Sequence, residues 1–593
     1  MNKLSQQMFS LDLRSLALMR VLFSLIILFD LVNRARYITA HYTDQGILPV
    51  SAMNNFYSDP WIFSFHAING SWQFQVILFL FAGLFALFLL VGYKTRLTTI
   101  LSWILLISLQ TRNPLILHGG DVLLRLALFW AIFLPWGSRY SIDSTHNQNK
   151  EALENNPSYS LASFAYILQI VFVYWFSALL KASSREWTID GTAIYYALSI
   201  DQFTTSFGYL LLKFPRVMHY LTFAVLQLEI AAPFLFLIPI FSQPLRLIGV
   251  LLIILLHIGI GLHIELGLFP WIGIATALAL LPPIFWEWIY ARLRTRLETG
   301  LTIYYDGECG FCKKTVMYLK IFLLLPEINL RSALEDDTIL QEMMHENSWV
   351  VVDAKKQHHY KFDGVGIIIK ASPLTWFLAP LLNLPTIHHI GTRLYEYTAR
   401  HRKNQCMPDP LQPAPIQKKL SASLRTVLPE TAVLMCITMV FVWNVGSLTE
   451  NYSILPSPLS TIVSLLRLDQ KWNTFAPSVL KDDGWYVMPG VLRNGTIADV
   501  FKNGRPVSWE KPPHVAALYN SERWRKYFIN LSSREFASWG TYYGEYMCRH
   551  WNETHNSNEQ LISFTMIFMR EHTLPNYQYS PPQQITLLKQ KCF

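Results

Sequence analysis

With 593 residues, the chain is long enough for several domains, and 52% hydrophobic against 15% charged residues excludes an ordinary soluble protein. The net charge of +9 is small for this length and forms no basic stripe, so we expect no nucleic-acid partner. Six scattered cysteines exclude a disulfide scaffold. We therefore expect an integral, multi-pass membrane protein whose first partner is the lipid bilayer.

Long apolar runs dominate the first half of the chain. They lie at residues 15–32, 74–92, 97–110, 122–136, 161–180, 220–240, 245–262 and 266–290. Some are shorter than the about 20 residues that a span needs, so we expect those helices to pack deep in a bundle. The polar start, with no small-residue cleavage site after it, predicts no cleaved signal peptide. Residues 1–298 are thus expected to form a bundle of about eight helices.

Basic residues in the connecting loops predict the orientation. If every run crosses, one side collects Lys3, Arg14, Lys94, Arg96, Arg139, Arg246, Arg292, Arg294 and Arg296. By the positive-inside rule this side is cytoplasmic. A ninth helix at 430–448 would then place residues 449–593 in the periplasm, if the membrane is a bacterial inner membrane.

Polar side chains interrupt the bundle in two segments. The segments are RNPLILHGGDVLLR and YWFSALLKASSREWTIDGTAIYYAL. Their candidate site residues are Asn113, His118, Asp121, Arg125, Lys181, Trp187 and Gly191. Weaker candidates in other helices are Glu229, His257, His263 and Glu265. Ionisable groups at membrane depth are costly, so they indicate a site or mutual pairing. In the purely structural alternative, Asp121 pairs with Arg125 one turn away, and Lys181 and Arg185 extend to lipid headgroups.

Together these two motifs resemble the HTTM family over residues 11–288. This family is the membrane domain related to vitamin K-dependent γ-carboxylase, in which a lysine of the second motif is taken to deprotonate vitamin K hydroquinone. Lys181 is the lysine that matches it, although Ala182 follows where the carboxylase has a lysine pair. The resemblance implies Lys181 as a base and a quinone or vitamin K-like lipid as the candidate cofactor.

The stretch LTIYYDGECGFCKKTVMY predicts a dithiol redox site. Residues 301–305 favour a strand, Asp306 and Gly307 a turn, and Cys309 to Cys312 the opening of a helix. Unpaired N–H groups at a helix start favour a thiolate, so the pKa of Cys309 should be lowered, and Cys312 lies one turn on. Zinc would need two more ligands, so we expect no metal, while a structural disulfide or an inactive cysteine pair stays open.

The string YYDGECGFC resembles the D-G-x-C-G-F-C signature of the DCC family of thiol-disulfide oxidoreductases, which are thioredoxin-like. The resemblance covers residues 301–406 and includes SWVVVD, YKFDG and the closing YEYTARHRKNQC, so we expect the domain at residues 299–406. It implies Cys309 as the nucleophile and Cys312 as the resolving thiol. The signature residues that would support them are Asp306, Gly307, Gly310 and Phe311.

The remainder of the chain predicts a tether and an extracytoplasmic domain. Residues 407–429 are polar and Pro-rich, as in a flexible linker. Within 449–593, short strands flank an Asn494-Gly495 hairpin turn, and the segment around Arg523 and Trp524 favours an amphipathic helix over a site. Cys548 and Cys592 are candidates for a disulfide. The expected fold is a polytopic α-helical membrane bundle with a thioredoxin-like α/β domain and a C-terminal mixed, β-containing domain.

Three functions compete on these residues. The leading one is a membrane-bound thiol-disulfide oxidoreductase that acts on a protein disulfide substrate or redox partner through Cys309 and Cys312. The second places quinone-linked or γ-carboxylase-like chemistry at Lys181. The third is a non-catalytic, membrane-anchored redox sensor or partner-binding protein.

Overall fold

The computed structural model describes residues 8–57, 61–145, 159–294, 300–325, 328–401, 422–533, 536–576 and 578–593. Lys3, Arg296, Cys406 and most of the expected linker lie outside the described residues.

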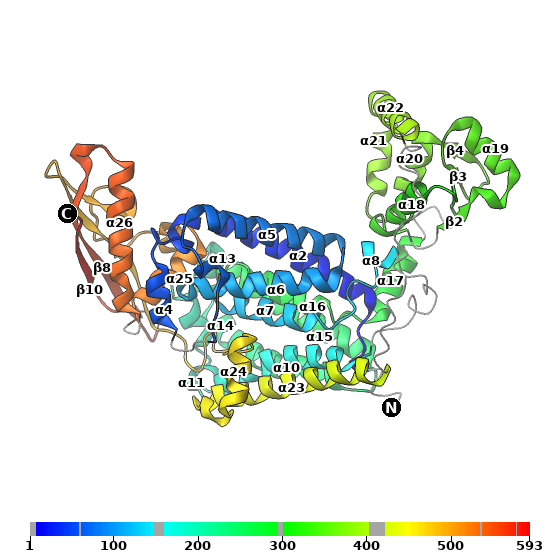
Figure 1. Cartoon of the computed structure of the whole chain (residues 1–593). Helices are drawn as coiled ribbons and strands as arrows, with labels where there is room; N and C mark the ends of the chain where they lie inside the picture. The colour runs from blue at the N-terminus through cyan, green and yellow to red at the C-terminus, as the bar shows by residue number, and fades with distance from the viewer. Residues whose placement is uncertain are drawn as a thin grey trace.

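A bundle of roughly parallel and antiparallel helices forms the middle of the molecule (Figure 1). Its main helices are α2 (Leu13–Ala35), α5 (Trp72–Val91), α6 (Thr95–Arg112), α7 (Gly119–Ala131), α10 (Leu161–Ala182), α14 (Pro215–Leu237), α15 (Ser242–His263), α16 (Phe269–Leu278) and α23 (Ala422–Thr449). Short helices connect them: α3 (Ile38–Tyr42), α4 (Val50–Phe56), η1 (Phe65–Ala67), η2 (Pro114–Ile116), α8 (Ile142–Thr145), α11 (Arg185–Thr188), α12 (Ala193–Leu198) and α13 (Ser206–Leu211).

Within the described residues, six helices are long and apolar enough to cross a membrane, namely α2, α5, α10, α14, α15 and the part of α23 from Pro429 to Thr449. The chain is therefore an integral, multi-pass membrane protein. The two shorter runs form α6 and α7, and nearly all of α7 is buried. Burial among its neighbours explains how α7 lies in the bundle with fewer residues than a lipid-exposed span requires.

The last predicted run of the first half, 266–290, differs from expectation. It forms α16 and α17 (Pro283–Arg294), which meet at an angle of 88°, and the pair would make a seventh span if counted as one. Pro282 and Pro283 stand at the break. Proline has no amide hydrogen and its ring clashes with the preceding turn, so a helix ends there.

The domain expected at residues 299–406, called the redox domain below, is a thioredoxin-like α/β unit. Its sheet has the order β2-β1-β3-β4, in which β1 (Thr302–Tyr305) pairs parallel with β2 (Asn329–Ser332) and antiparallel with β3 (Val350–Val352). The fourth strand, β4 (His358–Tyr360), pairs antiparallel with β3, so β2 and β4 are the edges. The helices are α18 (Gly310–Phe322), η3 (Ala333–Glu335), α19 (Asp337–Glu346), α20 (Lys361–Ala371), η4 (Trp376–Leu378), α21 (Ala379–Leu382) and α22 (Pro385–His401). Ile303, Val316, Val351 and Ile368 form its core.

The C-terminal domain combines a six-stranded sheet with helices. The strands are β5 (Asp482–Val487), β6 (Pro489–Leu492), β7 (Ile497–Asp499), β8 (Leu561–Leu574), β9 (Gln578–Tyr579) and β10 (Gln583–Lys591), and β8 pairs with β5, β6, β9 and β10. The helices of this part of the chain are η7 (Val500–Lys502), η8 (Val515–Leu518), α25 (Glu522–Leu531), η9 (Ala537–Trp539), α26 (Gly540–Thr554) and η10 (Ser557–Glu559), while η6 (Tyr452–Ile454) and α24 (Ser457–Leu465) lie against α23. Cys548 and Cys592 form a disulfide with a Cα–Cα distance of 5.3 Å.

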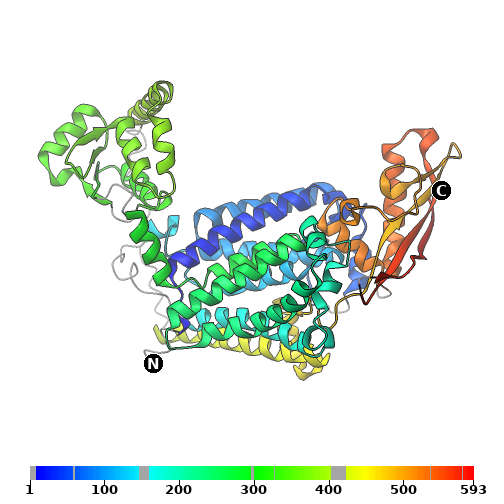
Figure 2. The ribbon, with the colours of Figure 1, turned by 180° about the vertical axis from the view of Figure 1, so that it is seen from behind.

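The two domains outside the bundle lie at opposite ends of it (Figures 1 and 2). The redox domain follows α17 at one end, and the C-terminal sheet with α26 lies at the other. A bilayer around the bundle would therefore separate them.

Candidate functional site

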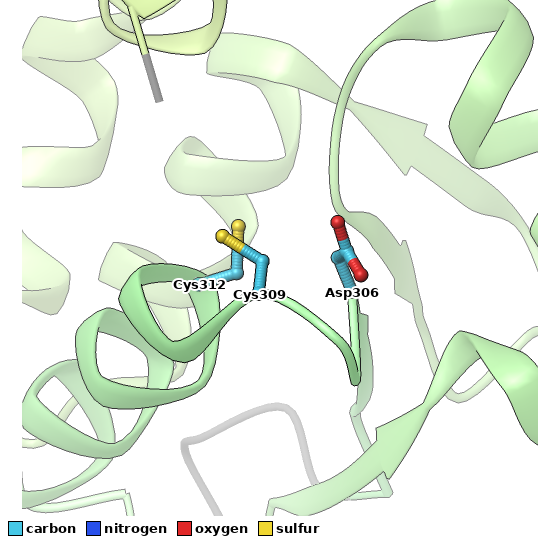
Figure 3. A group of neighbouring side chains, drawn as sticks. All are labelled: Asp306, Cys309 and Cys312. Carbon is cyan, nitrogen blue, oxygen red and sulfur yellow. The ribbon is translucent and has the colours of Figure 1, made fainter. Parts of the chain in front are cut away.

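The two cysteines of the predicted redox motif stand where β1 passes into α18. Cys309 is the residue before the first turn of α18, and Cys312 lies within that turn. The Asp306 carbonyl accepts a hydrogen bond from the Cys309 amide (3.3 Å), and the Glu308 amide donates to the Asp306 carboxylate (3.1 Å). These bonds shape the turn so that the carboxylate and both sulfurs lie within 4.8 Å of one another (Figure 3).

The position of the dithiol fits the chemistry expected of it. A helix start offers amide N–H groups and the positive end of the helix dipole, and both stabilise a thiolate. Cys309 is disulfide-bonded in this structure, whereas Cys312 is a thiol. Both cysteine side chains are buried, with exposed fractions of 2% and 1%. A substrate disulfide can reach them only after a neighbouring segment moves.

The other residues of the motif hold the turn in place. A Cβ on Gly307 would come 2.2 Å from the Ser332 hydroxyl, so the close approach of β2 requires glycine. Gly310 opens α18, and the carbonyl of the half-buried Phe311 accepts a hydrogen bond from Thr315 (2.8 Å).

Asp306 gives the two cysteines a third potential metal ligand. A structural zinc site normally has four protein ligands. In the described part of the chain, the group that could hold an ion around these cysteines stops at three.

A second group of polar side chains surrounds a cavity in the bundle. Lys181 forms an ion pair with Glu229, and its ammonium lies 4.8 Å from the centre of the Trp187 ring. All three side chains line a cavity of about 440 Å³, which is otherwise mainly apolar. The structure thus brings together Lys181, Trp187 and Glu229, and the weaker candidates His257 and His263 also line this cavity. Lys181 pairs inside the protein rather than extending to lipid headgroups.

Two groups that were weak or unnoticed in the sequence complete this cavity. His257 Nε2 lies 2.9 Å from the Tyr174 hydroxyl, and both residues line the wall. Among the described residues, neither Glu229 Oε2 nor His257 Nδ1 has a hydrogen-bond partner. Trp472 and Phe475 close the cavity from the segment after α24. A ligand with an apolar body and a compact polar group could form hydrogen bonds with both Glu229 Oε2 and His257 Nδ1.

Asp121 takes part in a buried ion cluster instead of pairing with Arg125. Its carboxylate binds Arg34 (2.6 Å) and Arg523 (3.1 Å), and Asp30 binds the same two arginines (2.7 Å each). Arg523 belongs to α25, so the segment predicted as an amphipathic helix is a helix, but its arginine is buried rather than solvated. This cluster fastens the C-terminal domain to the bundle.

The remaining predicted residues of the bundle have local structural contacts. Asn113 donates to the His41 carbonyl (3.0 Å), and His118 caps α7 by accepting a hydrogen bond from the Gly120 amide (3.0 Å). Arg125 pairs with Asp469 (2.8 Å). Gly191 has a φ of +63°, and a Cβ there would come 2.3 Å from His219. None of these contacts brings the four residues into the Lys181 cavity as the structure describes it.

Comparison with known proteins identifies two domains. A family model described as HTTM domain matches residues 9–286, and one described as DCC1-like thiol-disulfide oxidoreductase matches residues 303–406. Both resemblances drawn from the sequence motifs are thereby confirmed. Sporulation-delaying protein SdpB of Bacillus subtilis (strain 168) is 27% identical over 133 residues. That match covers 21% of this chain and 39% of SdpB. No solved structure matches.

Proposed function

We propose that this chain, which joins an HTTM domain to a DCC1-like thiol-disulfide oxidoreductase domain in one membrane protein, exchanges electrons with a protein disulfide through Cys309 and Cys312. The observation that supports the proposal best is the junction of β1 and α18. It holds both sulfurs and the Asp306 carboxylate within 4.8 Å of one another at a helix start.

The proposed reduction proceeds in two exchange steps. The Cys309 thiolate attacks one sulfur of the substrate disulfide, so a mixed disulfide forms and the other substrate sulfur leaves and takes up a proton. Cys312, once deprotonated, attacks Cys309, which closes the Cys309–Cys312 disulfide and releases the second substrate thiol. Two electrons and two protons have then passed from the dithiol to the substrate. Oxidation of a substrate dithiol is the same sequence in reverse.

The proposed orientation places the redox domain in the bacterial cytoplasm and the C-terminal domain in the periplasm. The basic loops of the sequence favour this assignment. The disulfide between Cys548 and Cys592 supports it as well, because disulfides persist in oxidising compartments. The dithiol and the Lys181 cavity would then face opposite sides of the membrane.

Trapping with Cys312→Ser tests the exchange mechanism. In the full-length protein purified in detergent, this variant lacks the resolving thiol, so its mixed disulfide with reduced-and-reoxidised insulin should accumulate and be released by dithiothreitol. Cys309→Ser should form no adduct, and both variants should lose insulin reduction to background. Cys436→Ser, a buried cysteine of α23, is the matched control and should react as the unchanged protein does.

Two results would contradict this proposal. If neither substitution changes insulin reduction and no adduct is trapped, the dithiol is not an exchange site. If the reduced protein instead reduces one equivalent of added disulfide and then stops despite excess reductant, it is a sensor and not an enzyme.

A second candidate function is favoured by the cavity beside Lys181. Its mainly apolar wall and the unpartnered atoms of Glu229 and His257 fit a ring lipid with oxygen at its edge, such as a quinone. Bound there, a quinone would supply two-electron redox chemistry. Lys181 and Glu229 would hold or exchange a proton at the ring oxygen, and Trp472 and Phe475 would exclude water.

Thermal stabilisation by added vitamin K quinone tests this second function without an activity assay. Ligand that binds the folded protein raises its melting temperature, and Lys181→Met should remove that rise. Lys181→Met leaves the buried Glu229 unpaired. The double variant with Glu229→Gln therefore shows whether the rise in melting temperature is still absent when no charge is buried. Arg185→Gln changes an exposed cation nearby and should keep the full shift. An unchanged shift in the double variant would exclude the cavity as the quinone site.

A further inference from the structure

A large groove lies on the outer side of the bundle, where two membrane helices meet the C-terminal domain. Its volume is about 1140 Å³, and α2 and α5 form one part of its wall while α25 and α26 form the other. The Tyr37 hydroxyl donates to the Asn520 carbonyl (2.9 Å) across this junction. Figure 1 shows this end of α2 and α5 beside α25. The groove is separate from the Lys181 cavity, with which it shares no lining residue.

The wall from α2 and α5 is apolar and open. On α5, Leu80, Leu84 and Leu87 are exposed by 68%, 41% and 49%. A Cβ on Gly83, which also lines the groove, would meet nothing within 4 Å. The lining residues of α5 run from Trp72 to Leu87, a rise of roughly 22 Å, while one leaflet of the hydrocarbon core is about 15 Å thick. An extended hydrocarbon chain therefore fits along this wall.

The opposite end of the groove is rich in hydrogen-bond donors. Arg36, Arg549 and His550 line it and are exposed, and the acidic lining residue there is Glu553. Arg549 donates to the Gln45 carbonyl (3.0 Å) with one of its five N–H groups. Trp524 is only 6% exposed, and within the described residues its indole N–H has no acceptor. A buried donor without an acceptor is costly, so a ligand that brings an oxygen to this point would stabilise the site.

We propose that this groove binds one membrane phospholipid with an anionic headgroup. The acyl chain lies against α2 and α5, and the phosphate lies near Arg36, Arg549 and the Trp524 indole. Two guanidinium groups against one carboxylate favour a negative headgroup, and arginine binds phosphate oxygens in pairs. The occupant comes from the bilayer because the apolar wall belongs to two membrane-spanning helices. The lipid would join the bundle to the C-terminal domain in the leaflet on that domain's side.

Lipid retention by the full-length protein tests this proposal. The protein is delipidated in detergent, mixed with phosphatidylglycerol or phosphatidylcholine, and weighed by native mass spectrometry. We expect one phosphatidylglycerol to be retained with an affinity at least about tenfold above that of phosphatidylcholine, because the cationic choline of phosphatidylcholine is repelled by the two arginines. The double variant Arg36→Gln with Arg549→Gln should remove this preference. Arg493→Gln, an exposed arginine outside the groove, should not.

A steric variant tests lipid binding in the groove independently of charge. Gly83→Leu projects a side chain into the open groove, and leucine favours helix more than glycine does, so α5 should fold. It should lower phosphatidylglycerol retention, whereas Gly366→Leu, on an equally open glycine of the redox domain, should leave it unchanged. Equal retention of both lipids by the unchanged protein would overturn the proposal. So would full retention in both the double arginine variant and Gly83→Leu.

Discussion

At the scale of single residues, Asp483 on β5 should make the stability of the protein depend on pH. It is 2% exposed and accepts hydrogen bonds from the Asp201 amide (2.5 Å) and the Gln202 side chain (2.8 Å). Burial, aided by the Asp201 carboxylate, raises the pKa of Asp483 to about 7. The folded state then holds a proton between about pH 4 and pH 7 that the unfolded state releases, so the free energy of unfolding falls as pH rises through this window, by at most about 4 kcal/mol.

Melting temperatures between pH 5 and pH 8 measure this effect. Asp483→Asn cannot titrate, so the part of the pH dependence that comes from this carboxyl should disappear. Asp482→Asn is the control, because Asp482 is next in the chain and its side chain is 55% exposed. If the Asp483→Asn profile still falls as steeply as that of the unchanged protein, another group is responsible.

Also at the residue scale, the dithiol could be predicted from the sequence, and the partners of the buried arginines could not. Cys309 and Cys312 were found because strand, turn and helix follow one another in a short stretch. Arg523 is predicted to belong to an amphipathic helix rather than a site, since helical periodicity identifies a polar side but not what covers it. Its acidic partners, Asp121 and Asp30, lie 402 and 493 positions away in the sequence. Only the packing of the C-terminal domain on the bundle brings them together.

At the scale of elements, hydrophobicity predicted where the helices lie better than how each one ends or bends. The run at 161–180 became α10, and the run at 245–262 became α15. The run at 266–290 looked continuous because a window of apolar residues does not register the break that two prolines impose. Lys181 and Glu229 could each be recognised in the sequence as a costly charge in an apolar helix. Their ion pair could not be predicted, because it depends on how α10 packs against α14.

At the scale of the whole molecule, the bundle separates two domains that differ in their redox chemistry. The redox domain contains the Cys-x-x-Cys motif, and the C-terminal domain at the other end contains a disulfide. If the first faces the cytoplasm, cellular reductants can regenerate Cys309 and Cys312, while the bond between Cys548 and Cys592 stays oxidised outside. The placement of both domains therefore follows from one property, the side on which the first helix begins.

Labelling with a membrane-impermeant maleimide tests this topology. Cys309 and Cys312 are buried and Cys548 is bonded to Cys592, so exposed sites are introduced instead: Met344→Cys on α19 and Ile497→Cys on β7, where the native side chains are 72% and 62% exposed. In intact spheroplasts Ile497→Cys should react, and Met344→Cys should react only after the membrane is permeabilised. The opposite pattern would place the dithiol in the oxidising compartment and favour donation of disulfides over their reduction. Reaction of both sites in intact spheroplasts would mean that the bundle does not separate the two domains.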